Sequence, residues 1–167
     1  MNQTTSCSAF FSNNCYFVSS KKTMNSKHNI MTHKITSDWK GEMAYEVETT
    51  GGKLQLDATL NENGKAKGMT PKYLMLVSLA GCTSMDVTSL LEKTRAQVTD
   101  FKVEVEAELT EEHPKYYNKV KMLYKFKGDD LQKDKIEKAV KLSVDRYCGV
   151  YEMFRQFADV SYEIIYN

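Results

Sequence analysis

Residues 70–94 constrain the fold of this 167-residue chain more than any other segment. Thr70 can cap the free amides of a helix and Pro71 is tolerated in a first turn, which predicts a helix from Pro71 to about Thr94. Its middle, YLMLVSLAGCTSMDVTSLL, is apolar on more than one face. A helix of this kind has to be packed on several sides, so we expect it at the centre of the fold.

The length and composition describe one domain, or one domain with a tail. Hydrophobic residues make up 41% of the chain, which is enough for a sizeable core. The net charge of +1 argues against a dedicated nucleic-acid partner. No uninterrupted apolar run approaches the roughly 20 residues that cross a bilayer, and the ends of the long helix are polar, so no membrane association is expected.

The first 33 residues differ in composition from the rest. They are rich in Ser, Asn and Thr, contain no acidic residue, and lack both the continuous apolar run of a secretory signal and the arginines of a transit peptide. We interpret residues 1–33 as a disordered tail or as the product of an early start codon, with targeting as the alternative. Under the first interpretation Cys7 and Cys15 carry no function, and the protein is cytoplasmic.

Alternation of apolar and polar residues predicts the strands. Residues 34–58 suggest a three-stranded meander with one buried face, because Ile35, Ser37 and Trp39 alternate with polar residues and Gly51-Gly52 is a turn signal. Two long strands follow at 98–109 and about 120–126, with acidic and basic outer faces suited to cross-strand pairing.

Two helices and a strand complete the chain. The helices are predicted from Leu131 to about Tyr147 and from near Cys148 to Phe157, and the last strand over 160–166. The element order βββ–α–ββ–α–α–β indicates an α+β fold built on antiparallel strands, with one domain over residues 34–167.

Two cysteines lie inside the patterned region. Cys82 is in the middle of the long helix, and Cys148 is at a break between two helices. They are either small buried hydrophobes or redox groups, and spacing alone does not show that they meet. If Cys148 starts the second helix, the positive helix end is expected to lower its pKa. Gly81 is costly in mid-helix, which suggests close approach of another chain or a ligand.

No metal or cofactor is predicted. The chain has no CxxC motif, and His33 and His113 have no ligand spacing relative to the cysteines. The many Tyr and Met residues are interpreted as core and interface.

Two blocks resemble the OsmC/Ohr superfamily of thiol-dependent peroxidases. They are TPKYLMLVSLAGCTSMDVTSLLEKTR and KAVKLSVDRYCGVYEMF, and the opening WKGEMAYEVETTGGKLQLD also matches. The resemblance implies an intertwined homodimer in which antiparallel sheets wrap around a central cysteine-bearing helix. It also implies that Cys82 is oxidised by an organic hydroperoxide to a sulfenic acid, that Cys148 resolves it as a disulfide, and that a dithiol reductant restores both thiols.

The chain departs from the family pattern in the groups that support the reactive thiolate. The family supplies an Arg from the N-terminal meander and a Glu ten residues before the cysteine, whereas this chain has Lys72 there and no Arg before Arg95. Lys72 and Arg146 are candidate cations near the thiolate, with ordinary solvated side chains as the alternative. Asp86 matches the family motif, and its expected role is a hydrogen bond to backbone or a partner helix, because its charge would raise a thiol pKa.

Two functions remain open from the sequence. One is an organic hydroperoxide peroxidase using Cys82 and Cys148. The other is a non-enzymatic dimer of the same fold that binds a small apolar ligand near Cys82, which the unmatched Arg and Glu favour.

Overall fold

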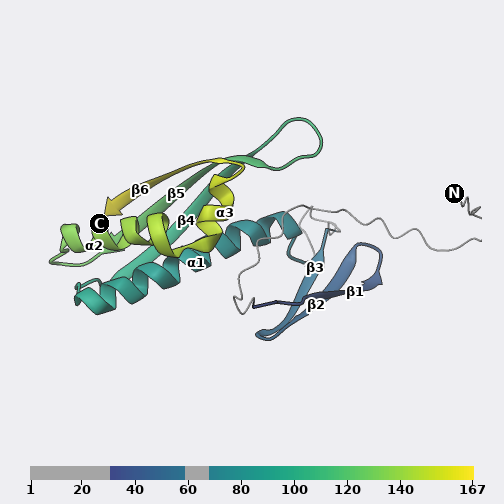
Figure 1. Cartoon of the computed structure of the whole chain (residues 1–167), viewed down its shortest axis with the longest axis horizontal. Helices are drawn as coiled ribbons and strands as arrows, with labels where there is room; N and C mark the ends of the chain where they lie inside the picture. Colours follow the sequence, from purple (N-terminus) through teal and green to yellow (C-terminus); the bar gives the residue numbers. More distant parts are fainter. Residues whose placement is uncertain (1–30, 59–67) are drawn as a thin grey trace, which may run out of the picture. The chain divides into compact units, whose positions relative to one another are not determined.

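The structure is a computed structural model that describes residues 31–58 and 68–167. Its elements follow the order β1–β2–β3–α1–β4–β5–α2–η1–α3–β6 (Figure 1), which confirms the predicted α+β class and element order. Internal contacts divide the chain into Met1–Lys34 and Ile35–Asn167. Most of the predicted tail, including Cys7 and Cys15, lies outside the described residues.

The predicted meander is present as an antiparallel sheet in the order β1–β2–β3. Its strands are β1 (Thr36–Gly41), β2 (Ala44–Thr49) and β3 (Gly52–Asp57). Gly52 has a φ of +130°, which L side chains rarely adopt, so the turn between β2 and β3 uses the glycine as predicted.

The face of the meander that was predicted to be buried is exposed in the single chain. Trp39 is 67% exposed and Met43 57%, and Val47 is the one buried residue of the three strands. A small sheet needs another layer to cover its apolar face, because three short strands cannot enclose a core by themselves.

The second sheet has the order β4–β5–β6. β4 (Asp100–Leu109) pairs antiparallel with β5 (Tyr117–Lys127), but β6 (Asp159–Tyr166) pairs parallel with β5. The expectation of a wholly antiparallel fold is therefore wrong for the last strand. The physical reason is the helical crossover between β5 and β6, which returns the chain to the starting end of β5 before the next strand begins.

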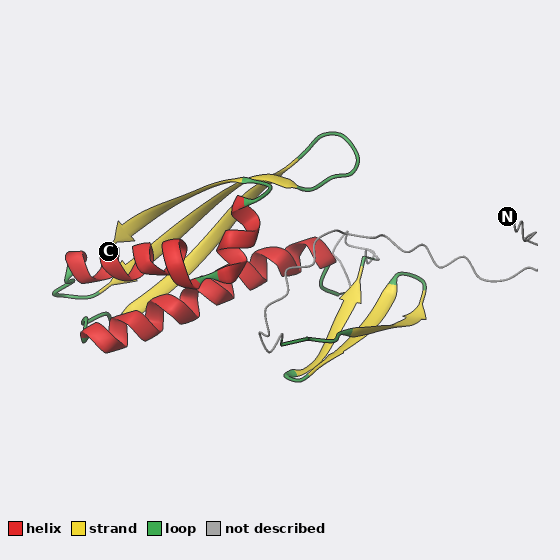
Figure 2. Cartoon of the chain, in the orientation of Figure 1, coloured by secondary structure: helices red, strands yellow, loops and turns green. Residues whose placement is uncertain are grey.

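Helices cover one face of this sheet, and charged pairs line the other. Figure 2 shows α1 (Pro71–Thr94), α2 (Lys133–Leu142) and α3 (Gly149–Arg155) on the same side of β4–β6. The core between them includes the fully buried Val120, Met122, Tyr124 and Phe126 of β5. On the outer face the Lys119 Nζ lies 3.3 Å from a carboxylate oxygen of Glu108, and the Lys125 Nζ lies 2.5 Å from a carboxylate oxygen of Glu104. These ion pairs confirm the predicted cross-strand pairing.

The helix boundaries agree with the prediction for α1 and differ for the next helix. Thr70 is the N-cap of α1, although its side chain makes no capping hydrogen bond. The helix predicted from Leu131 to Tyr147 begins at Lys133 and ends as an α-helix at Leu142, where a π-helical turn, η1 (Ser143–Tyr147), replaces it.

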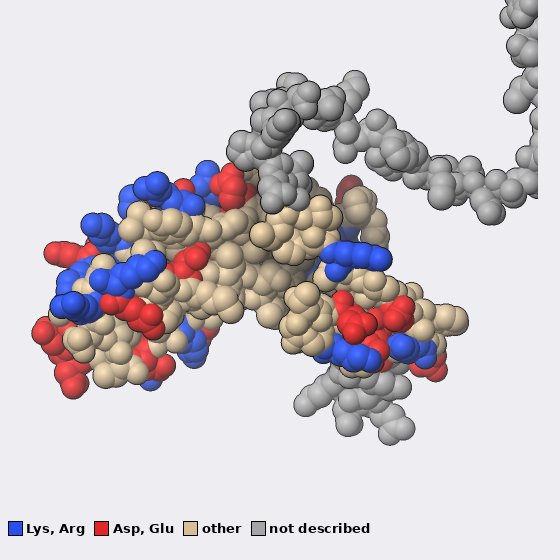
Figure 3. Space-filling view, turned by 60° about the horizontal axis from the view of Figure 1, so that its bottom comes forward, with Lys and Arg blue, Asp and Glu red and all other residues tan. Residues whose placement is uncertain are grey.

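One side of α1 packs on the core and another is exposed. Leu79, Thr83, Val87 and Leu91 are buried, whereas Tyr73, Val77 and Met85 are 59%, 53% and 75% exposed. On the face of the molecule that Figure 3 presents, an uncharged area lies between two groups of charged side chains.

Contrary to the sequence-based expectation, α1 is long and apolar enough to cross a membrane, a criterion that core helices of folded domains also meet.

Candidate functional site

The two candidate cysteines come from different helical elements. Cys82 is near the middle of α1 and half-buried, beside the buried stripe that includes Leu79 and Thr83. Cys148 is the N-cap of α3 and only 3% exposed. Both are free thiols. The long helix and the break between η1 and α3 therefore present one sulfur each.

The structure brings Cys82, Asp86 and Cys148 together. The Sγ atoms of the two cysteines and a carboxylate oxygen of Asp86 all lie within 4.8 Å of one another. Cys82 and Asp86 are four residues apart on α1, so they share a face, while Cys148 reaches them only through the tertiary fold. A pair of sulfurs at this separation can form a disulfide after a modest movement.

The π-helical turn positions Cys148. Its amide donates to the carbonyl of Ser143, five residues earlier, at 2.9 Å. This widened turn adds a residue to the helical path, so the chain leaves the helix at Cys148 and restarts as α3. The N-terminal amide of Tyr151 then points back at the Cys148 sulfur, with a nitrogen–sulfur distance of 3.4 Å.

A chain of buried hydroxyl groups lies beside the thiols. The Ser143 hydroxyl donates to the Asp86 carboxylate at 3.3 Å and lies 3.0 Å from the Thr83 hydroxyl, which in turn lies 2.7 Å from the phenol oxygen of Tyr124. Asp86, expected to form a hydrogen bond to backbone or a partner helix, accepts one from the side chain of Ser143 in η1. Thr83 and Tyr124 were not among the predicted site residues; the sequence signal available was a polar threonine on an otherwise apolar stripe.

Burial raises the pKa of the Cys148 thiol to about 12. A hydrogen bond with Cys82 acts in the same direction, as do the negative charges of a Cys82 thiolate and of Asp86. The Tyr151 amide lowers the pKa, as expected for a residue that starts a helix, but this effect is smaller than that of burial. The prediction of a lowered pKa for Cys148 is therefore wrong.

The two candidate cations are exposed in the single chain. Lys72 is exposed on the first turn of α1, ten residues before Cys82, and a rise of 1.5 Å per residue separates them by about 15 Å along the axis. Arg146 is exposed on η1, with its guanidinium 6.0 Å from the ring centroid of Tyr147.

The two histidines of the described residues are exposed. His113 is exposed in the loop between β4 and β5, and His33 is exposed before β1. Within residues 31–58 and 68–167, the group able to hold a metal ion is the one formed by Cys82, Asp86 and Cys148. The sequence offered the four-residue spacing of Cys82 and Asp86, but not the approach of Cys148.

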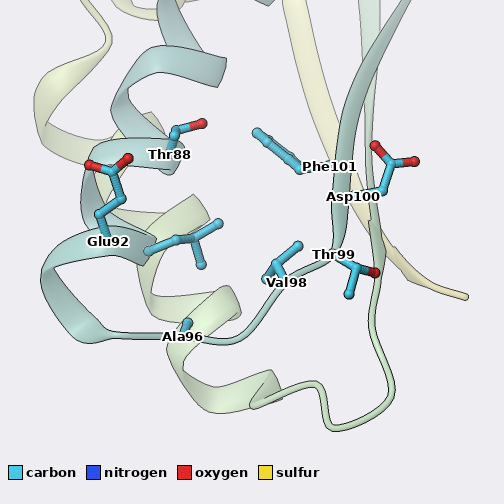
Figure 4. Close-up of a pocket in the computed structure, with 8 residues that line it drawn as sticks. Thr88, Glu92, Ala96, Val98, Thr99, Asp100 and Phe101 are labelled. Carbon is cyan, nitrogen blue, oxygen red and sulfur yellow. The ribbon is translucent and has the colours of Figure 1, made fainter.

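Two pockets lie away from the thiols. One, of about 270 Å³, is bounded by the end of α1 and the start of β4, where Figure 4 shows Glu92, Val98 and Phe101 around it. The other, of about 430 Å³, is largely apolar and is lined by residues that include Tyr73, Leu109 and Tyr117. Neither contains Cys82, so the ligand pocket expected near this residue does not coincide with them.

Three relatives illustrate what the chain resembles. The Escherichia coli protein YhfA is 31% identical over 108 residues, which are 64% of this chain and 81% of that protein. A solved structure of a hypothetical protein from Aquifex aeolicus is 28% identical, has a TM-score of 0.69, and aligns over 83% of this chain and 99% of that one. An organic hydroperoxide resistance protein, OsmC, from Legionella pneumophila is 18% identical, has a TM-score of 0.60, and aligns over 83% and 99%.

A family model agrees with these similarities. The model for the OsmC-like protein family matches residues 64–163, a range that contains α1, the second sheet through most of β6, and both cysteines of the site. The chain therefore belongs to the OsmC-like protein family, as its two cysteine-containing blocks had suggested.

Proposed function

We propose that this protein is a thiol-dependent reductase of organic hydroperoxides. The observation that carries the proposal is the approach of the free thiols of Cys82 and Cys148, whose sulfurs lie within 4.8 Å of each other. Family membership and the hydroperoxide-resistance function named for the Legionella relative support it.

In the first step the Cys82 thiolate attacks one oxygen of the hydroperoxide. The O–O bond breaks, the alcohol leaves after taking a proton, and Cys82 becomes a sulfenic acid. Cys82 suits this role better than Cys148, because it is half-buried and the Cys148 thiol has a raised pKa.

In the second step the Cys148 sulfur attacks the sulfenic sulfur of Cys82. The S–S bond forms, the S–O bond breaks, and the hydroxide leaves as water with the proton of Cys148. With a thiol pKa of about 12, Cys148 needs a proton acceptor, and we assign this role to the Asp86 carboxylate, which lies within 4.8 Å of the sulfur, takes the proton and passes it to the leaving hydroxide. A dithiol donor then reduces the disulfide and is itself oxidised. Free thiols at this site suit a reducing compartment such as the cytoplasm.

The active form in this proposal is a homodimer. Exposed Trp39, Met43, Val77 and Met85 leave apolar surface on both the meander and α1 that a second copy would cover. An assembled dimer is also the form in which a cation from another copy could approach Cys82.

The test is anaerobic oxidation of the reduced full-length chain by cumene hydroperoxide. We expect loss of peroxide and a disulfide between Cys82 and Cys148 by mass spectrometry. Cys148→Ser should stop at a sulfenic acid that dimedone captures, and Cys82→Ser should consume no peroxide. The double variant Cys7→Ser/Cys15→Ser is the control and should behave as the wild type. Peroxide consumption by Cys82→Ser at the wild-type rate would contradict the proposal.

A second candidate is a dimer that binds a small apolar molecule. The unmatched family Arg and Glu favour it, as does the apolar pocket at Tyr73 and Tyr117. It predicts saturable binding of an apolar fluorophore that Tyr73→Ala weakens, together with no peroxide turnover by the reduced wild type.

A further inference from the structure

The cluster of Cys82, Asp86 and Cys148 has the composition of a metal site. It offers two sulfurs and one carboxylate oxygen, all within 4.8 Å of one another. Thiolate and carboxylate are both ligands of Zn²⁺, which takes four ligands in a tetrahedral arrangement. We propose that the reduced protein binds one Zn²⁺ ion through Cys82, Cys148 and Asp86, with the fourth coordination position open.

The distances suit this ion. A Zn–S bond of about 2.3 Å and a Zn–O bond of about 2.0 Å place tetrahedral ligand atoms roughly 3.5–3.8 Å apart. The three ligand atoms are separated by up to 4.8 Å. Side-chain movements of about one ångström would therefore bring them to the spacing of tetrahedral zinc ligands. Cys82 and Asp86 are only half-buried, which leaves a route for the ion.

Neighbouring groups already hold two of the ligands. The Ser143 hydroxyl donates to the Asp86 carboxylate, and the Tyr151 amide donates to the Cys148 sulfur. Hydrogen bonds of this kind orient metal ligands and strengthen binding. Ser143 itself contacts Thr83, and both residues are fully buried, so one oxygen of the carboxylate is held by a buried hydroxyl network.

The charge of the site favours a cation. All three ligands are neutral or negative, and among the described residues no Lys, Arg or His forms an ion pair with Asp86. A divalent ion would supply a positive charge beside the two sulfurs.

The binding reaction balances by release of protons. The ion takes two thiolates, so each Cys gives up its S–H proton, and about two protons leave for every ion bound. Because binding releases protons, the affinity for the ion should rise with pH. When the ion is bound, both thiolates are occupied by the metal. The Cys82 sulfur then cannot attack a hydroperoxide, so binding of Zn²⁺ and reaction with hydroperoxide would exclude each other at Cys82.

The test titrates reduced full-length protein with Zn²⁺ in the absence of oxygen, against a chromophoric zinc chelator. We expect one ion per chain in the wild type. Affinity should fall at least about tenfold in Cys82→Ser, in Cys148→Ser and in Asp86→Asn. Asp145→Asn is the matched control, because Asp145 is an exposed acid of η1 that pairs with Lys141, and it should bind as the wild type does.

The tail cysteines require their own control. Cys7→Ser/Cys15→Ser should keep the single ion, and Co²⁺ bound to this variant should show thiolate-to-metal charge-transfer absorption that Cys148→Ser loses. Far-UV circular dichroism checks that each variant is folded. Binding that disappears with Cys7 and Cys15, or that is equal in all variants, would overturn the proposal. Neither readout uses peroxide, so failure of the peroxidase proposal and failure of this one are distinguishable.

Discussion

The hydroxyl oxygen of Thr83 lies 2.7 Å from the phenol oxygen of Tyr124, and both side chains are fully buried. This contact joins the cysteine helix α1 to the central strand β5 at the level of the thiol pair. The same Thr83 hydroxyl oxygen also lies 3.0 Å from the hydroxyl oxygen of Ser143 in the π-helical turn. One buried hydroxyl therefore ties together the three elements that determine where Cys148 lies relative to Cys82.

Thr83→Val should destabilise the protein more than Tyr124→Phe. The valine leaves the Tyr124 phenol buried without its oxygen partner, at a cost of about 1–3 kcal/mol. Phenylalanine removes one member of the pair and leaves Thr83 bonded to Ser143, at a cost of about 1 kcal/mol. Urea unfolding measures both. Thr88→Val, on an exposed position of α1, is the control and should be near neutral; equal losses at Thr83 and Thr88 would contradict the network.

Stability should fall as pH rises above about 9, in part through Cys148. Burial raises the pKa of this thiol from 9.0 to about 12 in the folded protein, so the unfolded state loses its proton first and gains stability from ionisation. The contribution is complete below the unfolded pKa and is lost between about pH 9 and pH 12. Chemical denaturation should show that Cys148→Ser loses less free energy of unfolding between pH 8 and pH 10.5 than the wild type does. Identical pH profiles for the two proteins would show that the thiol ionises normally.

Gly81→Ala should weaken the proposed dimer without unfolding the chain. A Cβ built at Gly81 meets nothing within 4 Å in the single chain, so no contact inside the chain requires glycine there. In a monomer, alanine would stabilise α1 by up to about 1 kcal/mol. Sedimentation velocity over a concentration series measures association. Gly149→Ala, also without a neighbour within 4 Å, is the control; stabilisation at Gly81 with unchanged association would argue against a second copy at this position.

Lys72→Met should leave the reaction of Cys82 with iodoacetamide within about twofold of the wild-type rate at pH 7.5. Its place on the same helix puts it about 15 Å from Cys82 along the axis, beyond the screening length of roughly 8 Å at physiological salt. Arg146→Met tests the other candidate in the same assay, with Lys138→Met as an exposed-lysine control. A several-fold fall in Lys72→Met alone would instead show that the lysine supports the thiolate in an assembled form.

Local sequence patterns determined much of the fold. The bounds of α1, the meander and the two long strands follow from periodicity, caps and turn residues, because these properties depend on neighbours in the chain. The same reasoning identified Cys82 and Cys148, although only the family resemblance joined them into one site.

Tertiary structure decided the rest. The parallel pairing of β6 depends on the crossover through α2 and α3, and the raised pKa of Cys148 depends on burial outweighing the effect of the helix end. The approach of Cys148 to Cys82 and Asp86, and the hydroxyl chain through Thr83, are contacts between residues far apart in sequence. Periodicity assigns a residue to a face of a helix or strand, but the sulfur, carboxylate and hydroxyl groups that meet across those faces are set by how the elements pack.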